Sequence, residues 1–485
     1  MTRQFLINSF MWSAVHRLIP QIIQFGISII IARLLLPAEY GLMAMLAIFF
    51  ALATAFADAG FSYGLIQRKE ISIDEETSVF ILNIVAGLIL MIFLCVLSPL
   101  VAIFFKQPLL TMILCVSSLQ IFFSSFVIVQ NALLTRNLDF KKQAIISTIV
   151  NLFSGTVGIF MAFQGFGVWS LVGLNLSSSI MNVVLVWSVY SWRPVGRFRW
   201  SCIKSLWPFS SSLLASDLLN TLFLNMYSIV IGRLYRPADL GFFSRASSIS
   251  QMPANVIGGI VGRFTLPFFS RLQDNECLLK ATFRKSLRAL AVVHFPFMIC
   301  LAAASEPLVR FLLTEKWLPC VPYLQILCFS GLLHPLHAMH LNVLMALGRS
   351  DLFFKLEIAK KILTVILLSV TYRYGVMAIV WGFLILSILC YGINGYYSNK
   401  LLHYKWLEQG KDLLPIFLVS LLTGSTVWMV LKINYLNDWL LIILQCIVGV
   451  TVYGLIVFIG RKSIYADSLI LAKDFQKTLL NQGNP

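Results

Sequence analysis

The sequence contains few charged residues for its length. Only 12% of its 485 residues are Asp, Glu, Lys or Arg, whereas soluble globular chains carry about 25%. Hydrophobic residues make up 59%, and the mean hydropathy is +0.86. These values exclude a soluble protein of two or three domains, because an apolar surplus of this size needs lipid to cover it.

The sequence also lacks the motifs of soluble enzymes. It has no Walker A loop, no GxGxxG after a strand and no HExxH motif. Its nine cysteines are scattered, mostly through apolar runs, without CxxC or Cys/His spacing, which favours packing residues over disulfides or metal ligands. We therefore expect no enzymatic activity, no metal ion and no cofactor. Transport by such a chain has to be driven by an ion gradient, the membrane potential or the gradient of the substrate.

Long apolar runs are what the sequence has in abundance. The run from Val79 to Phe105 exceeds the ~20 residues that a helix needs to cross a bilayer. Breaks at Pro, Gly and charge clusters divide the chain into fourteen such segments. They are 9–33, 41–63, 77–104, 108–133, 143–163, 167–191, 203–233, 239–262, 286–311, 319–346, 353–372, 375–399, 413–432 and 438–460. We predict an all-α polytopic membrane protein with about fourteen transmembrane helices.

Lysines and arginines are distributed unequally between the two sets of loops. The termini and every second loop hold 26 of them, whereas the alternate loops hold eight. By the positive-inside rule, both termini are predicted to be cytoplasmic. Cytoplasmic loops face anionic lipid headgroups, so the net charge of +17 needs no nucleic-acid partner.

Two eleven-residue segments have similar sequences, and we call them the two copies of a repeated phrase. "IARLLLPAEYG" begins at Ile31 and "IGRLYRPADLG" begins at Ile231. A second pair, "QGFGVWSLVG" and "YRYGVMAIVWG", aligns Gly167 with Gly375. Six predicted spans separate the copies, so both halves have the same orientation, as in a parallel repeat. Within the phrase, we expect Pro and Gly to reverse the chain, and Arg and the acid to link the two helix ends.

The repeat predicts the domain organisation. We expect a six-helix lobe with a cytoplasmic linker over 1–200 and a pseudosymmetric six-helix lobe over 201–400, offset by about 200 residues. Two further helices follow over 401–460, and a cytoplasmic tail follows over 461–485. Two similar lobes around a central cleft are a common plan for carriers that work by alternating access. A duplication that merely enlarges the bundle is the alternative.

Polar residues form matching stripes in the first span of each lobe. Helical spacing places Arg17, Gln21, Gln24 and Ser28 on one face, and a shift of 200 gives Asp217, Thr221, Leu224 and Ser228. A charge at membrane depth is costly unless it faces water or a partner, so we expect both stripes to line the cleft. We further expect Arg17 to approach Asp217 in one access state. The alternative is that Arg17 extends to the cytoplasmic interface.

Other ionisable residues lie inside the predicted spans. Arg245 and Arg263 are further cavity candidates, although Arg263 also fits the cytoplasmic exit. Asp58 fits a site for a coupling cation or a structural acid beside the Gly60 turn. Histidine also occurs here: His294, His334, His337 and His340. No carboxylate or thiolate completes a metal site, which favours polar contacts within the bundle or a weakly basic cavity lining. Proton coupling through His294 or His337 is the alternative.

Two longer blocks resemble a known family. "IARLLLPAEYGLMAMLAIF…FADAGFSYGLIQRKEIS" is similar to the N-terminal signature of the polysaccharide-transporter family, the Wzx-type lipid-linked oligosaccharide flippases. "EKWLPCVPYLQIL" from Glu315 and "ALGRSDLFFKLEIAKK" from Ala346 resemble a later block, closest to the colanic-acid-exporter-like branch. These flippases belong to the multidrug/oligosaccharidyl-lipid/polysaccharide exporter superfamily. The resemblance covers roughly residues 5–400.

The resemblance implies fourteen helices and outward flipping of undecaprenyl-diphosphate-linked glycan repeat units across the bacterial inner membrane. It also implies a cationic lumen for the diphosphate, which Arg17, Arg245 and Arg263 would provide, since guanidinium is a fixed-charge fork of donors. Partners would be membrane lipids and polysaccharide polymerase or assembly proteins. Two alternatives stay open: a cation-coupled multidrug or small-solute antiporter, and a non-transporting scaffold of a glycan-assembly complex.

Overall fold

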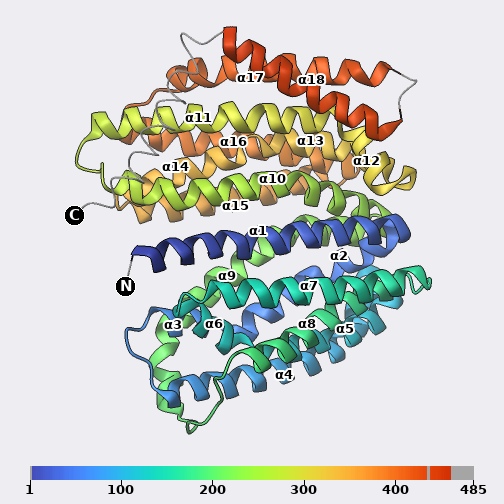
Figure 1. The fold of residues 1–485 in the computed structure, drawn as a ribbon, viewed down its shortest axis with the longest axis vertical. Helices are drawn as coiled ribbons and strands as arrows, with labels where there is room; N and C mark the ends of the chain where they lie inside the picture. The colour runs from blue at the N-terminus through green and yellow to red at the C-terminus, as the bar shows by residue number, and fades with distance from the viewer. Residues whose placement is uncertain (1–2, 434–436, 460–485) are drawn as a thin grey trace. The chain divides into compact units, whose positions relative to one another are not determined.

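The computed structural model describes the backbone of residues 3–433 and 437–459, and their side chains except for residues 3–18 and 259–264. Every regular element in these ranges is a helix (Figure 1), which confirms the predicted all-α class. In the first half these are α1 (Arg3–Leu34), α2 (Pro37–Asp58), α3 (Phe61–Gln67), α4 (Ile73–Phe105), α5 (Leu109–Ser125), α6 (Ile128–Arg136), α7 (Phe140–Phe163), α8 (Trp169–Val189) and α9 (Trp200–Leu234). In the second half they are α10 (Pro237–Ser270), α11 (Glu276–Ala303), α12 (Ser305–Leu313), η1 (Glu315–Cys320), α13 (Val321–Gly331), α14 (His334–Ala346), α15 (Ser350–Thr371), α16 (Val376–Leu402), α17 (Trp406–Met429), η2 (Val430–Lys432) and α18 (Asp438–Ile459).

Most of these helices are long and apolar enough to cross a bilayer. Ten meet this description among the described residues, and an eleventh is gained if α5 and α6, which meet at 43°, form one bent span. The helix α15 is less apolar because five charged residues occur between Asp351 and Lys361. The predicted number of fourteen therefore stays a prediction, whereas a polytopic helical protein is established.

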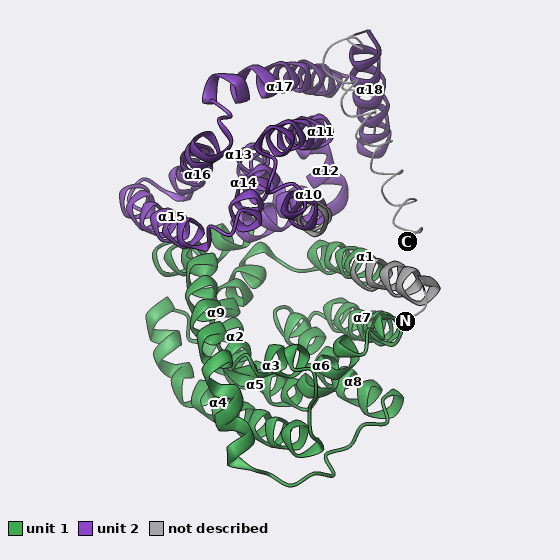
Figure 2. Cartoon of the chain, turned by 90° about the vertical axis from the view of Figure 1, so that its left-hand side faces the viewer, with its two compact units in different colours: residues 1–241 green, residues 242–485 purple. Residues whose placement is uncertain are grey.

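The chain divides into two compact units, residues 1–241 and residues 242–485 (Figure 2). In the first unit α4 packs on α5, and α7 packs on both α1 and α8. Helix α9 also packs on α2 and α4, so packing extends the first unit beyond residue 200. The predicted lobes over 1–200 and 201–400 follow the sequence repeat rather than packing, and they stay a prediction, as do the predicted segments 401–460 and 461–485.

The start of α4 shows how local sequence fixes a helix boundary. The Ser72 side chain accepts a hydrogen bond from the Glu75 amide at 3.2 Å, and Glu75 accepts one from the Ser72 amide at 3.0 Å. This reciprocal capping satisfies amide donors that a helix otherwise leaves free. Acidic residues Asp74, Glu75 and Glu76 follow in the first turn, where they complement the helix dipole.

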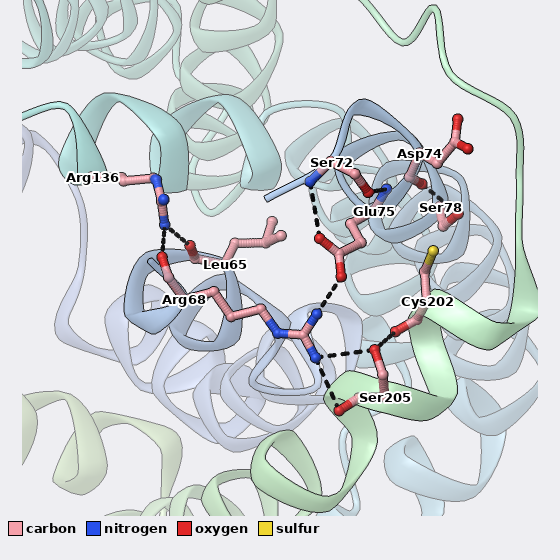
Figure 3. A network of polar contacts seen from close by, with 9 residues as sticks. All are labelled: Leu65, Arg68, Ser72, Asp74, Glu75, Ser78, Arg136, Cys202 and Ser205. Atoms are coloured by element: carbon pink, nitrogen blue, oxygen red, sulfur yellow. Dashed lines mark hydrogen bonds and ion pairs between the residues drawn. The ribbon is translucent and has the colours of Figure 1, made fainter. Parts of the chain in front are cut away.

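A polar network holds the ends of several first-unit helices together (Figure 3). Arg136, at the end of α6, donates to the carbonyl oxygens of Leu65 and Lys69 at 2.7 Å each, and also to that of Arg68. Arg68 forms an ion pair with Glu75 at the start of α4, and it donates to the Ser205 hydroxyl on α9 at 3.0 Å. The network therefore joins α3, α4, α6 and α9 at one end of the unit.

In the second unit, α17 is fastened to α11. Asp412 on α17 is 6% exposed and accepts hydrogen bonds from Arg284 Nε at 2.5 Å and Nη2 at 2.7 Å. The Tyr404 hydroxyl also donates to Asp412, at 2.6 Å. Burial and the neighbouring carboxylate both raise the pKa of Tyr404, so this phenol stays protonated and able to donate. These contacts anchor the C-terminal helix pair, since α18 in turn packs on α17.

Candidate functional site

The two copies of the repeated phrase pack against each other. Pro37 and Pro237 are the first residues of α2 and α10. A Cβ atom added at Gly41 would overlap the carbonyl oxygen of Pro237, and one added at Gly241 would overlap that of Pro37. Both glycines lie inside their helices, where they permit this backbone contact. The prediction that they reverse the chain is therefore wrong.

The acidic residue of each copy forms a hydrogen bond to a backbone amide in the same copy. Glu39 accepts from the amide of Leu36 at 2.6 Å, and Asp239 accepts from the amide of Arg236 at 3.2 Å. Both carboxylates therefore cap the start of a helix. In the second copy the expected link to the preceding arginine is absent, because Arg233 donates to the carbonyl oxygen of Phe104 instead.

Both glycines of the second repeat pair have an unusual backbone conformation. Gly167 precedes α8 with φ of 57°, and Gly375 precedes α16 with φ of 97°. Both values lie in the left-handed region that glycine tolerates and other residues rarely adopt. The two positions that align in the sequence therefore share a positive φ shortly before a helix.

Three of the polar residues predicted in the first unit lie on its surface or near it. Gln21 is half-buried on α1, Gln24 is exposed, and Asp217 is exposed on α9. Asp58, at the end of α2, lies within electrostatic range of Asp217. The Asp58 carboxylate accepts from the Ser62 amide at 3.1 Å and from its hydroxyl at 2.6 Å, which are the contacts expected of a structural acid.

Of the three predicted arginines, only Arg245 has a side chain among the described residues. Arg245 is buried, with 5% of its surface exposed, on the α10 segment that belongs to the second unit. Its guanidinium lies within electrostatic range of the Cys320 thiol, at the end of η1. The side chains of Arg17 and Arg263 lie outside the described residues, so the predicted arginine lining and the approach of Arg17 to Asp217 stay predictions.

The histidines of the second unit make specific contacts. Asn394 donates to Nδ1 of His337 at 3.2 Å, which leaves the ring proton on Nε2, facing the Ser387 hydroxyl at 3.5 Å. Ser387 in turn donates to the Ser330 carbonyl at 3.1 Å. These contacts link His337 on α14 to Ser387 and Asn394 on α16.

The other two buried histidines are similarly engaged. Nε2 of His294 lies 3.0 Å from the Gly331 carbonyl, so this nitrogen is the donor. His340 is fully buried, with Nδ1 2.7 Å from the Ser398 hydroxyl. Across the described residues, no three His, Cys, Asp or Glu side chains are grouped closely enough to hold a metal ion.

An apolar groove of about 430 Å³ opens beside these histidines. Helices α11, α13, α16 and α17 contribute most of its lining: Phe295, Phe329, Leu332, Leu333, Leu384, Ile388, Tyr391, Trp406, Gln409, Gly410, Leu413, Leu414 and Phe417. Tyr391 connects the groove to the interior. Its ring contacts those of His337 and His340, and its hydroxyl donates to Gln409 at 3.1 Å. The groove therefore combines a mostly apolar lining with one hydrogen-bonded polar pair, Tyr391 and Gln409.

This groove is not predicted by the sequence. Its lining residues are separated by more than 120 positions along the chain and read singly as ordinary residues of apolar spans. The one local signal is the break "HYKWLEQG" from His403 to Gly410, which brings Trp406 and Gln409 into an otherwise apolar region.

Known proteins with similar sequences act in glycan biosynthesis. A family model described as "Polysaccharide biosynthesis protein" matches residues 30–322. The chain is 27% identical over 399 residues to the lipopolysaccharide biosynthesis protein WzxC of Escherichia coli (strain K12), covering 80% of this chain and 79% of WzxC. It is 26% identical over 373 residues to the teichuronic acid biosynthesis protein TuaB of Bacillus subtilis (strain 168), covering 76% and 77%.

The fold is also found among solved structures. The chain is similar to the lipid II flippase MurJ in an inward closed conformation, with a TM-score of 0.74 and 16% sequence identity. The match covers 94% of this chain and 99% of MurJ. At this identity the likeness concerns the fold. Because the family model spans more than half of the sequence, the chain belongs to the polysaccharide biosynthesis protein family.

Proposed function

We propose that this protein is a flippase that moves undecaprenyl-diphosphate-linked oligosaccharide repeat units across the bacterial inner membrane by alternating access. The observation that carries the proposal is the apolar groove of about 430 Å³ with the hydrogen-bonded pair Tyr391 and Gln409 in its lining. Membership of the polysaccharide biosynthesis protein family supports it. Both termini are proposed to be cytoplasmic, and polysaccharide polymerase or assembly proteins are proposed as partners.

The groove suits the lipid part of such a substrate. A polyprenyl chain is a long hydrocarbon, and its burial against side chains such as Leu384, Leu413 and Phe417 removes apolar surface from contact with polar groups. The tail can stay in an apolar environment while the headgroup is transferred. The protein then has to provide a polar route only for the diphosphate and the sugars.

The polar surface of the first unit suits that route. Gln24 and Asp217 are exposed on helices of a membrane protein, where lipid is a poor environment for an amide or a carboxylate. We propose that these residues, with Gln21 and the arginines Arg17, Arg245 and Arg263, contact the hydrated headgroup. Among polar groups, guanidinium is well suited to bind a diphosphate, because it donates in a planar fork and keeps its charge.

The test is to fill the groove without disturbing the fold. Gly410 lines the groove, and a Cβ atom at this position meets nothing within 4 Å. Gly454 on α18 has equally open space around it but lies outside the groove lining, so it provides a matched control. The variants Gly410→Phe and Gly454→Phe are compared in proteoliposomes that contain a fluorescent polyprenyl-diphosphate-linked oligosaccharide.

We expect Gly410→Phe to slow flipping about tenfold or more, because the phenyl ring would displace a few methylene groups of the lipid from the groove. Gly454→Phe should flip the lipid at the wild-type rate. Equal rates for the two variants would remove the groove from the mechanism. Failure of the wild-type protein to flip the lipid-linked oligosaccharide, in a preparation that melts cooperatively, would overturn the proposed function.

A further inference from the structure

A second pocket, of about 460 Å³, lies at one end of the first unit. It is formed where α4 ends, at Phe105, and where α9 turns into α10, between Leu234 and Pro237. These helix ends belong to the side that the loop charges predict to be opposite the cytoplasm. The pocket is remote in sequence from the groove of the second unit, and the two share no lining residue.

The lining of this pocket is strongly cationic. Lys106, Arg233 and Arg236 line it together with a single carboxylate, that of Asp239. The Asp239 carboxylate accepts from the backbone amide of Arg236, so it serves the start of α10. Lys106 and Arg236 are both exposed, and no ion pair with either is present among the described residues. The pocket therefore has an excess of positive charge.

Arg233 is held in a fixed position at the pocket wall. It donates to the carbonyl oxygen of Phe104, and its guanidinium carbon lies 5.1 Å from the centre of the Phe104 ring. This cation–π contact orients the planar guanidinium without neutralising it. Lys106 is fixed at its backbone, because it ends α4 in the left-handed conformation with φ of 57°. Two of the three cations thus extend from rigid helix ends.

An apolar surface continues from the pocket along α4. Val96, Leu100 and Ile103 lie on one face of this helix and are 72%, 62% and 72% exposed. Phe104, beside Arg233, is 44% exposed. In a membrane-spanning helix such a face contacts hydrocarbon. A cationic pocket at the end of an apolar helix face matches a ligand that has an anionic head and a hydrocarbon chain.

We propose that this pocket binds the phosphate headgroup of an amphipathic lipid, whose chain lies along the exposed face of α4. Lys106 and Arg236 provide the main charge, and Arg233 provides oriented donors. Two kinds of lipid carry such a phosphate headgroup, a bilayer phospholipid and a polyprenyl phosphate. The proposal concerns binding alone, so it does not rest on the proposed flippase function.

The experiment measures lipid binding to the purified full-length protein in a neutral detergent by native mass spectrometry. The probes are phosphatidylglycerol, cardiolipin and undecaprenyl phosphate, with inorganic phosphate as the headgroup without a chain. The test variant is the double substitution Lys106→Gln and Arg236→Gln. The control is Arg373→Gln with Lys432→Gln, which removes the same charge from the same predicted side but lies outside the pocket lining.

We expect the test variant to bind at least one lipid phosphate about thirtyfold more weakly than the control does, because each Lys or Arg near an anionic lipid contributes several-fold to affinity. Selective loss of undecaprenyl phosphate would identify the polyprenyl source, and loss of the phospholipids would identify the bilayer source. Equal weakening in both variants would indicate general charge attraction and overturn the site. Inorganic phosphate binding as tightly as the lipids would overturn the role of the α4 face.

Discussion

The backbone of Gly41 lies directly against the carbonyl group of Pro237, whose carbon atom would be 2.5 Å from a Cβ atom at Gly41. The same relationship holds in reverse between Gly241 and Pro37. The two copies of the repeated phrase are therefore more than a trace of duplication. Each copy presents the proline carbonyl that the other copy's glycine accommodates, and the contact is self-complementary as a two-fold arrangement requires.

The first prediction concerns this contact. Gly41→Ala introduces a methyl group where the Pro237 carbonyl stands, so the N-terminal turns of α2 and α10 have to separate. We expect a loss of about 1–3 kcal/mol in stability, as is usual for overpacked sites. Thermal unfolding in one detergent measures it. Gly26→Ala, on an open face of α1, is the control and should be neutral or slightly stabilising.

The double variant Gly41→Ala with Gly241→Ala sharpens this test. Separation of the two helix ends relieves both clashes at once, so the combined loss should be clearly smaller than the sum of the single losses. Additive losses, or a Gly41→Ala protein as stable as Gly26→Ala, would contradict the close contact.

The second prediction concerns Arg136, which donates to four carbonyl groups between Leu65 and Lys69. Arg136→Lys keeps the charge but loses the planar fork that reaches these acceptors together. We expect a loss of about 1–3 kcal/mol in stability and faster amide exchange in residues 65–70. The comparison is Lys69→Gln, which removes an exposed charge from the same loop. Unchanged exchange in Arg136→Lys would show that the network does not order this loop.

The third prediction concerns the buried histidine contacts. His337→Leu leaves the buried Asn394 amide without its acceptor, and we expect a loss of about 1–3 kcal/mol in stability. Replacing both partners, as in His337→Leu with Asn394→Leu, should recover much of the loss, because no polar group is then stranded. Addition of a metal chelator should leave the melting temperature of the wild-type protein unchanged. A melting temperature that falls with chelator would instead indicate a metal site at the histidines.

The fourth prediction concerns the polar stripes of α1 and α9. Arg17→Asp and Asp217→Arg should each reduce glycan export about tenfold or more in cells that have no other flippase, since each places like charges together at membrane depth. The exchange of both charges in one protein should restore part of the export. If the double variant is no better than the single ones, and a cysteine pair at these positions never cross-links, the predicted pairing is wrong.

Much of the architecture follows from the sequence because it depends on local and periodic properties. The apolar runs identify the helices, since a segment such as Ile73–Phe105 has little choice but to lie in lipid. The repeated phrase and the pair Gly167 and Gly375 predict two repeated halves, and both glycines have a positive φ that glycine tolerates. The family resemblance also came from contiguous blocks, and the family match confirms it.

The contacts that give the chain its particular sites depend on tertiary structure. Gly41 reads in the sequence as a turn residue, yet it lies inside α2, and only packing shows that its missing side chain makes room for Pro237. Tyr391, Trp406 and Gln409 lie on two separate segments of the sequence, and the fold brings them together in the lining of one groove. Sequence periodicity determines which face of a helix is apolar, whereas the choice of partner between distant helices is made by side-chain shape and backbone approach in the folded protein.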